Sequence, residues 1–101
     1  MTAPTRLCIV EDLTIYHAME QKQQLVAALE EAEALELDLS HVAEIDTAGL
    51  QLLMLAKREA GRLGKRMAIV AHSPAVRQTI DFCNLAAFFG DPVIITAREQ
   101  V

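Results

Sequence analysis

Three small or polar residues, Asp46, Thr47 and Gly49, interrupt the apolar passage HVAEIDTAGLQLLMLAK. A carboxylate directly before a helix accepts hydrogen bonds from first-turn N–H groups, which have no partner within the helix. The helix dipole adds partial positive charge at the same end, which attracts anions. The pattern predicts Asp46 as an N-cap and Thr47 as a hydroxyl whose phosphate would find free donors around Ala48 and Gly49. Gly49 would also let a partner approach closely. A simple cap, with Gly49 making room for packing, explains the same residues.

Other arrangements for chemistry have less support in the sequence. His17, His41 and His72 fall on separate elements without HxxxH spacing, so we expect surface or capping histidines and no metal site. Ser73 beside His72 is a conceivable nucleophile, but Ser73 followed by Pro74 is also typical of a helix start. The four glycines form neither a P-loop nor a GxGxxG motif. The sequence therefore favours a protein that is not an enzyme and has no catalytic residues and no cofactor.

Length and charge narrow the classes further. The chain has 101 residues, of which 52% are hydrophobic, which predicts a single domain over residues 1–101. The net charge of −5 argues against general nucleic-acid binding. Basic residues gather in KREAGRLGKR, residues 57–66. That stretch either meets an acidic partner or a lipid headgroup, or is the solvated end of a helix.

The cysteines and the apolar runs bear on the compartment. Cys8 and Cys83 lie far apart without a CxxC motif, which favours two buried, reduced thiols. No apolar run approaches about 20 residues, and the first residues lack the apolar core of a signal peptide. We therefore expect a cytoplasmic protein without membrane insertion.

The elements that must position Asp46 and Thr47 follow from hydrophobic periodicity. Strands are predicted over residues 6–10, 34–40, 66–72 and 92–96, where apolar residues alternate or run together. Helices are predicted from about residue 14 or 17 to 34, over 47–63 ahead of Gly64, and over 73–84 with Asn84 in the left-handed conformation. The first of these carries an apolar stripe of Ala18, Met19, Leu25, Val26 and Leu29. Residues 85–92 are expected to form a turn or short helix. This alternating order predicts an α/β layer fold with at least partly parallel pairing.

The stretch from residue 35 to residue 89 resembles the STAS domain, named for sulphate transporters and anti-sigma factor antagonists. Four features match in order: a strand ending in LDLS, IDTAGL at the start of a long helix, GKRMAIV, and SPAVRQTIDFCNL before a final strand. The resemblance implies a mixed β-sheet of about four or five strands with helices packed mainly on one face.

The resemblance also implies a function. Family members of the anti-sigma factor antagonist type act by partner switching: the unphosphorylated protein binds an anti-sigma factor that is also a serine/threonine kinase. Phosphorylation of a Ser or Thr after the motif Asp breaks the complex, and a phosphatase restores it. Carried over, the phospho-acceptor is Thr47. The implied partner-binding surface comprises Val42, Ala43, Glu44, Ile45, Asp46, Thr47, Ala48, Gly49 and Leu50.

Two departures keep other family roles open. Many antagonists have Ser at the acceptor and a further Ser or Thr next to it, whereas this chain has Thr47 and Ala48. DTAGL is similar to the small STAS subunit of the phospholipid-transport ABC system, which binds the transporter ATPase. The loop EDLTIYHA also lacks the Gly and acidic pair common in the family. The alternatives are such a transporter subunit or a STAS adaptor in a chemotaxis-type signalling cluster.

Overall fold

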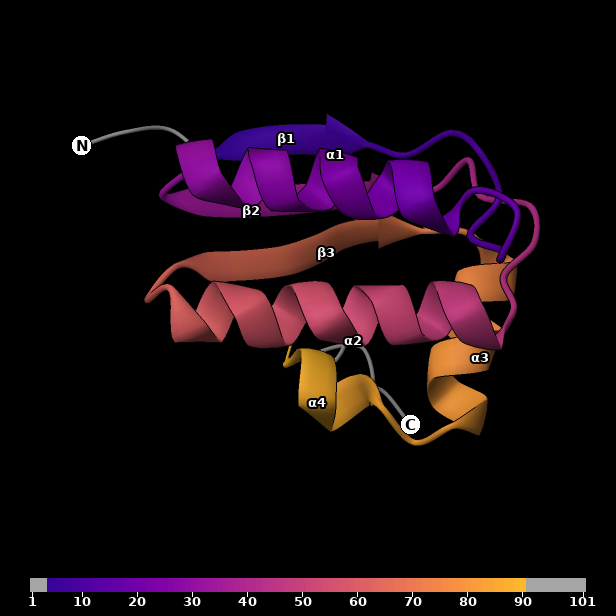
Figure 1. The fold of residues 1–101 in the computed structure, drawn as a ribbon. Coiled ribbons are helices and arrows are strands. Elements are labelled where there is room, and N and C mark those ends of the chain that lie inside the picture. Colours follow the sequence, from indigo (N-terminus) through magenta and orange to yellow (C-terminus); the bar gives the residue numbers. More distant parts are fainter. Residues whose placement is uncertain (1–3, 91–101) are drawn as a thin grey trace.

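The computed structural model describes residues 4–90 and shows a parallel sheet with two helices along one face (Figure 1). Its strands are β1 (Thr5–Cys8), β2 (Ala34–Leu39) and β3 (Arg66–His72), paired in the order β1-β2-β3. The helices are α1 (Ala18–Glu31), α2 (Thr47–Arg62), α3 (Pro74–Phe82) and the single turn α4 (Ala86–Phe89). The predicted α/β order is confirmed over this part of the chain.

The sheet differs from the prediction in size and pairing. Residues 4–90 form three strands rather than four or five, and both strand pairs are parallel rather than mixed. A helix follows each of the first two strands and returns the chain to the end of the sheet where that strand began. Consecutive strands therefore run in the same direction. The strand predicted over residues 92–96 lies outside the described residues.

Apolar and acidic residues alternate along β2, and this alternation decides which face of the sheet meets the core. Leu35, Leu37 and Leu39 are fully buried, whereas Glu36 and Asp38 on the other face are half-buried. The leucines pack with residues of α1 and α2, among them Leu25, Leu29, Leu53 and Ala56. The leucines therefore lie on the side of the sheet that faces α1 and α2. Figure 1 shows these two helices along one face of the sheet.

Helix ends agree with the sequence prediction where local chemistry decides them. Ser73 is the N-cap of α3, and its Oγ accepts a hydrogen bond from the Val76 N–H at 3.2 Å. Gly64 and Asn84 follow α2 and α3 with φ of 70° and 58°. These left-handed residues end their helices, as predicted.

The predicted burial of the two thiols is wrong. Cys8 and Cys83 are free thiols on the surface: Cys8 lies on an edge strand and Cys83 caps the end of α3. In α1, Met19 and Val26 are 73% and 36% exposed, although they belong to the predicted apolar stripe. The groove that α1 forms with α2 leaves these side chains uncovered.

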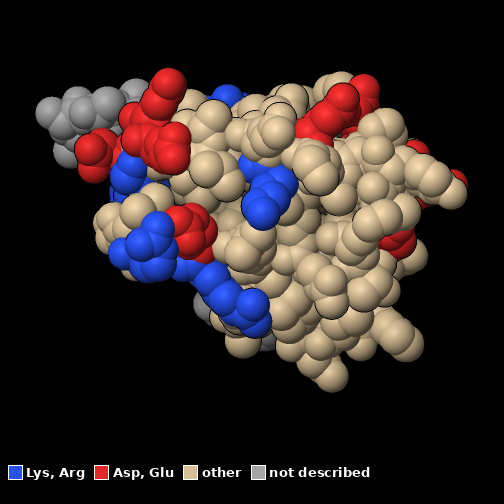
Figure 2. All heavy atoms as spheres, viewed as in Figure 1, with Lys and Arg blue, Asp and Glu red and all other residues tan. Residues whose placement is uncertain are grey.

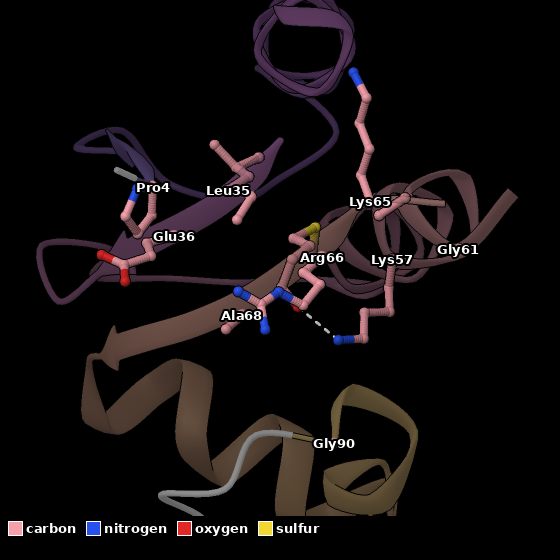
Figure 3. Close-up of a pocket in the computed structure, with 12 residues that line it drawn as sticks. Pro4, Leu35, Glu36, Lys57, Gly61, Lys65, Arg66, Ala68 and Gly90 are labelled. Carbon is pink, nitrogen blue, oxygen red and sulfur yellow. Dashed lines mark hydrogen bonds between the residues drawn. The ribbon is translucent and has the colours of Figure 1, made fainter. Parts of the chain in front are cut away.

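The basic stretch is engaged mostly within the chain. Lys57 Nζ donates to the Met67 carbonyl at 2.6 Å, and Lys65 Nζ donates to the Leu29 and Glu30 carbonyls in the last turn of α1 (Figure 3). Both lysines line a pocket of about 450 Å³ between α2 and the start of β3, away from the first turn of α2. Both amines are therefore held by backbone carbonyls of this chain. Within residues 4–90, no helix is long and apolar enough to cross a bilayer.

Candidate functional site

The Asp46 carboxylate joins two loops at the start of α2. Asp46 Oδ1 accepts a hydrogen bond from the Gly49 N–H at 2.9 Å, which is the predicted N-cap contact. Asp46 Oδ2 accepts a second bond from the Ile15 N–H at 3.0 Å, in the loop that precedes α1. These bonds, from Gly49 first and Ile15 next, lower the pKa of Asp46. The carboxylate is therefore ionised at neutral pH and holds the first loop against the helix end.

Asp12, in the loop before α1, accepts hydrogen bonds from the loop before α2. Asp12 Oδ1 accepts hydrogen bonds from the Ala43 and Glu44 N–H groups, both at 3.1 Å. The Asp12 carbonyl in turn accepts a bond from Gln21 Nε2 of α1 at 2.9 Å. Nothing local in the sequence indicates that Asp12 has a partner 31 residues away.

The backbone of Leu13 completes the junction. Leu13 N–H donates to the Glu44 carbonyl at 2.9 Å, and the Leu13 carbonyl accepts from the Asp46 N–H at 3.0 Å. This short parallel bridge pairs Leu13 with Ile45 beyond the ends of β1 and β2. The loop before α2 is thus held by backbone bonds as well as by two carboxylates.

Gly49 serves this internal junction. A Cβ at Gly49 would lie 1.9 Å from the Leu13 carbonyl oxygen and 2.5 Å from the Leu13 carbonyl carbon. Gly49 is buried, so the space that its missing side chain leaves is filled by this chain. The packing interpretation of Gly49 is therefore correct, and the interpretation that Gly49 opens the site to a partner is wrong.

Thr47 is the exposed hydroxyl at this helix end. Thr47 is the first residue of α2, and residues 4–90 provide no hydrogen-bond partner for its side chain. The predicted phosphate donors are partly occupied, because the Gly49 N–H already binds Asp46. A phosphate on Thr47 would lie beside the Asp46 carboxylate rather than in an empty anion site.

The nine residues predicted to bind a partner differ in exposure. The exposed members are Ala43, Glu44 and Thr47. The half-exposed members are Ile45, Asp46 and Ala48. The buried members are Val42, Gly49 and Leu50. The predicted surface is corrected at these last three positions, which are buried inside the domain.

An apolar surface beside Thr47 was not predicted. Ile15, Tyr16 and Met19 are 63%, 89% and 73% exposed at the start of α1. Figure 2 shows a largely uncharged surface over the N-terminal half of α2, with acidic side chains and one basic side chain over the N-terminal half of α1, whereas basic side chains gather toward the other end of α2. Met19 belongs to the predicted apolar stripe of the first helix, and only the tertiary arrangement leaves it uncovered.

The structure also bears on the two other kinds of site, a serine nucleophile and a metal site. Ser73 is buried and its Oγ is used as the cap of α3, so the hydroxyl is not presented to a substrate. In the described part of the chain, one group of three potential metal ligands comes together, Glu11, His17 and Glu20, with ligand atoms within 4.8 Å. Glu11 Oε1 and His17 Nδ1 there lie 3.2 Å apart on the surface. The sequence did not predict this group.

Comparisons with known proteins agree with this geometry. Residues 2–94 match the family described as "Mlab, STAS domain". The fold is similar to that of the anti-sigma factor antagonist SpoIIAA in its unphosphorylated form, with a TM-score of 0.68 and 16% identity over 99% of this chain and 90% of that chain. It is also similar to the Bacillus cell fate determinant SpoIIAA in the phosphorylated form, with a TM-score of 0.63 and 15% identity over 99% of this chain and 94% of that chain. At these identities the similarity to the solved structures is one of fold. A comparison with curated proteins finds no significant match.

Proposed function

The chain belongs to the STAS-domain family, as its motifs predicted, and we propose that it is a regulatory binding protein that changes partners when Thr47 is phosphorylated. The unphosphorylated protein binds an anti-sigma factor of the serine/threonine kinase type. That kinase, with ATP, phosphorylates Thr47 and the complex separates. A phosphatase then restores the binding form.

The exposure of Thr47 carries this proposal. Its hydroxyl lies on the surface at the first position of α2, where Asp46 and the Leu13 backbone hold the chain in one conformation. A kinase needs an accessible hydroxyl, and a fixed backbone presents it in a reproducible geometry. Capping alone requires Asp46 and does not require a hydroxyl at position 47.

A phosphate at this position changes the surface by charge. Phosphorylation adds a charge of about −1.5 to −2 at neutral pH. The nearest carboxylate, Asp46, is held ionised by its hydrogen bonds, and Glu44 is exposed on the preceding loop. The added phosphate therefore increases an existing negative charge and opposes a partner that docks on the neighbouring surface, where Ile15 and Met19 are exposed.

A second candidate is the STAS subunit of a phospholipid-transport ABC system, in which Thr47 contacts the transporter ATPase without being phosphorylated. The description of the matching family, which names Mlab, favours it. Ala48 in place of a second hydroxyl points the same way. A STAS adaptor in a chemotaxis-type cluster uses the same surface with a different partner.

Affinity purification of position-47 variants from the native cells tests the proposal. Wild-type protein and Thr47→Ala are expected to retain a kinase-type anti-sigma factor. The amount recovered with Thr47→Glu is expected to be at least about tenfold lower, because like charges across an interface are costly. Thr5→Glu is the matched control, because Thr5 is exposed at the amino end of β1, whereas Thr47 follows the carboxyl end of the parallel strand β2. Quantitative mass spectrometry of the recovered proteins gives the result.

Two outcomes separate the candidates. Recovery of a membrane ATPase with wild-type protein, and no phosphate on Thr47, would establish the transporter subunit. Equal recovery of one partner by wild-type protein, Thr47→Glu and Thr5→Glu would contradict both roles of Thr47.

A further inference from the structure

A groove runs between α1 and α2, beginning beside Thr47. Its wider part, about 670 Å³, is lined by residues of both helices and of the loop before α1. The lining residues that matter are Ile15, Met19, Lys22, Ala48, Leu55 and Arg58. We call this surface the α1–α2 groove.

The groove continues along the helix pair. A second hollow of about 280 Å³ shares Lys22 and Leu55 with the first and extends to Val26 and Glu59. From Ala48 to Glu59 the floor follows α2 over twelve residues, which are separated by eleven helical steps. At a rise of about 1.5 Å per residue this is roughly 16 Å, or about three turns of a helix.

Its walls are apolar and uncovered. Leu55 is 42% exposed, and Ile15 and Met19 are exposed further still. These side chains protrude at both rims instead of enclosing a cavity. Several large apolar side chains in one contiguous surface mark an interaction site, whereas scattered ones need no explanation.

One cation stands in the middle of the groove without a partner. Lys22 makes no ion pair or hydrogen bond with any residue between 4 and 90, and it lines both hollows. Arg58 also lines the wider part of the groove, and its Cζ lies 5.6 Å from the centroid of the Phe88 ring. The groove therefore combines an apolar floor with positive charge at its centre.

We propose that the α1–α2 groove binds an amphipathic helix of a partner protein, with apolar residues spaced over about three turns and a carboxylate that pairs with Lys22. Such a helix places residues i, i+3 or i+4, and i+7 into a groove of this length. This inference rests on the proposed function in one respect, since it takes the switched partner to be a protein.

Charge and shape favour this occupant over two others. A small apolar ligand in a pocket is usually buried over 70–90% of its surface, and a groove whose rims are this exposed cannot enclose one to that extent. A second copy docking its own α1–α2 groove by two-fold symmetry would bring Lys22 close to the same residue of its mate. An amphipathic helix with a central carboxylate can place apolar side chains against the groove walls and pair its carboxylate with Lys22.

The groove also connects the partner to Thr47. Ala48 lines the end of the groove and is the next residue after Thr47. A phosphate on Thr47 would therefore add negative charge at the mouth of a site that receives a carboxylate-bearing helix. Binding of that helix and phosphorylation then oppose each other.

Site-directed photo-crosslinking in the native cells tests the proposal. A benzophenone amino acid is placed at Met19 or at Leu55 in the groove, and at Phe82 of α3 as a control that is 87% exposed. Both groove positions are expected to capture the same partner segment, read out by mass spectrometry as an amphipathic helix with Asp or Glu among its residues. Phe82 is expected not to capture it.

A charge exchange identifies the contact. Lys22→Glu is expected to reduce this cross-link at least tenfold, and a carboxylate-to-Lys change in the captured segment is expected to restore it. Arg66→Glu is the matched control, because Arg66 is an exposed base on β3 outside the groove, and it is expected to leave the cross-link within twofold of wild type.

The remaining outcomes overturn the inference. Capture of lipid, of a second copy of this chain, or of a non-helical segment at Met19 and Leu55 contradicts it, as does no capture at either position. If Thr47→Glu still releases the co-purifying partner in those cases, partner switching stands and only the groove assignment fails. If Thr47→Glu also has no effect, both fail.

Discussion

A methyl group added at Gly49 collides with the backbone of Leu13. The Cβ would lie 1.9 Å from the Leu13 carbonyl oxygen, and ordinary contact begins at 3.4 Å. Helix α2 and the loop must therefore separate by about 1.5 Å in the Gly49→Ala variant. A shift of that size breaks the two backbone hydrogen bonds of Leu13, which now measure 2.9 and 3.0 Å.

The cost follows from these contacts. Overpacking costs about 1–3 kcal/mol, and each lost backbone bond costs about 1 kcal/mol. The higher helix propensity of Ala offsets about 1 kcal/mol of this loss of stability. The free energy of unfolding is therefore expected to fall by about 2–4 kcal/mol, which lowers Tm by roughly 10–30 °C in a domain of this size.

Gly61→Ala is the matched control, because it makes the same change in the same helix. Gly61 is exposed, and a Cβ there would meet nothing within 4 Å. We expect this variant to gain up to about 1 kcal/mol. Urea unfolding followed by far-UV circular dichroism measures both, since the chain has no Trp for fluorescence. A Gly49→Ala midpoint equal to that of wild type would refute the assignment of Gly49 to the loop junction.

The cap residues give two further predictions. The pKa of Asp46 is lowered by its backbone hydrogen bonds, so the stability it contributes is complete above about pH 4 and is lost as the pH falls through the folded pKa. Asp46→Asn should therefore show a smaller decline in unfolding free energy between about pH 5 and about pH 2 than wild type, and an unchanged decline would contradict the two hydrogen bonds. Ser73→Ala should lower the unfolding free energy by about 1 kcal/mol through loss of the Val76 contact. Ser73→Thr should recover most of it, and equal thermal melts for Ala and Thr would exclude a capping role.

Short-range chemistry was predictable from the sequence. Asp46 and Ser73 were identified as N-caps, and Gly64 and Asn84 as left-handed ends, because each depends on a few neighbouring residues. The alternation around Leu37 identified the buried face of β2 for the same reason.

Long-range contacts were not predictable. The hydrogen bonds that Ala43 N–H donates to Asp12 and Ile15 N–H donates to Asp46 each join residues 31 apart. No pattern in one sequence specifies that pairing. The burial of Val42 and the exposure of Met19 also depend on which elements meet. Periodicity shows that a face is apolar, and it does not show whether this chain or a partner covers that face.

The most direct test of partner switching follows phosphate and partner together. Wild-type protein is purified with its co-purifying partner and incubated with ATP, with Thr47→Ala in parallel as the control. We expect intact mass and site mapping to show one phosphate, on Thr47, appearing as the partner dissociates, and we expect the Thr47→Ala complex to persist. An unmodified Thr47 in a complex that stays intact with ATP, or dissociation that proceeds equally in Thr47→Ala, would contradict the proposed function.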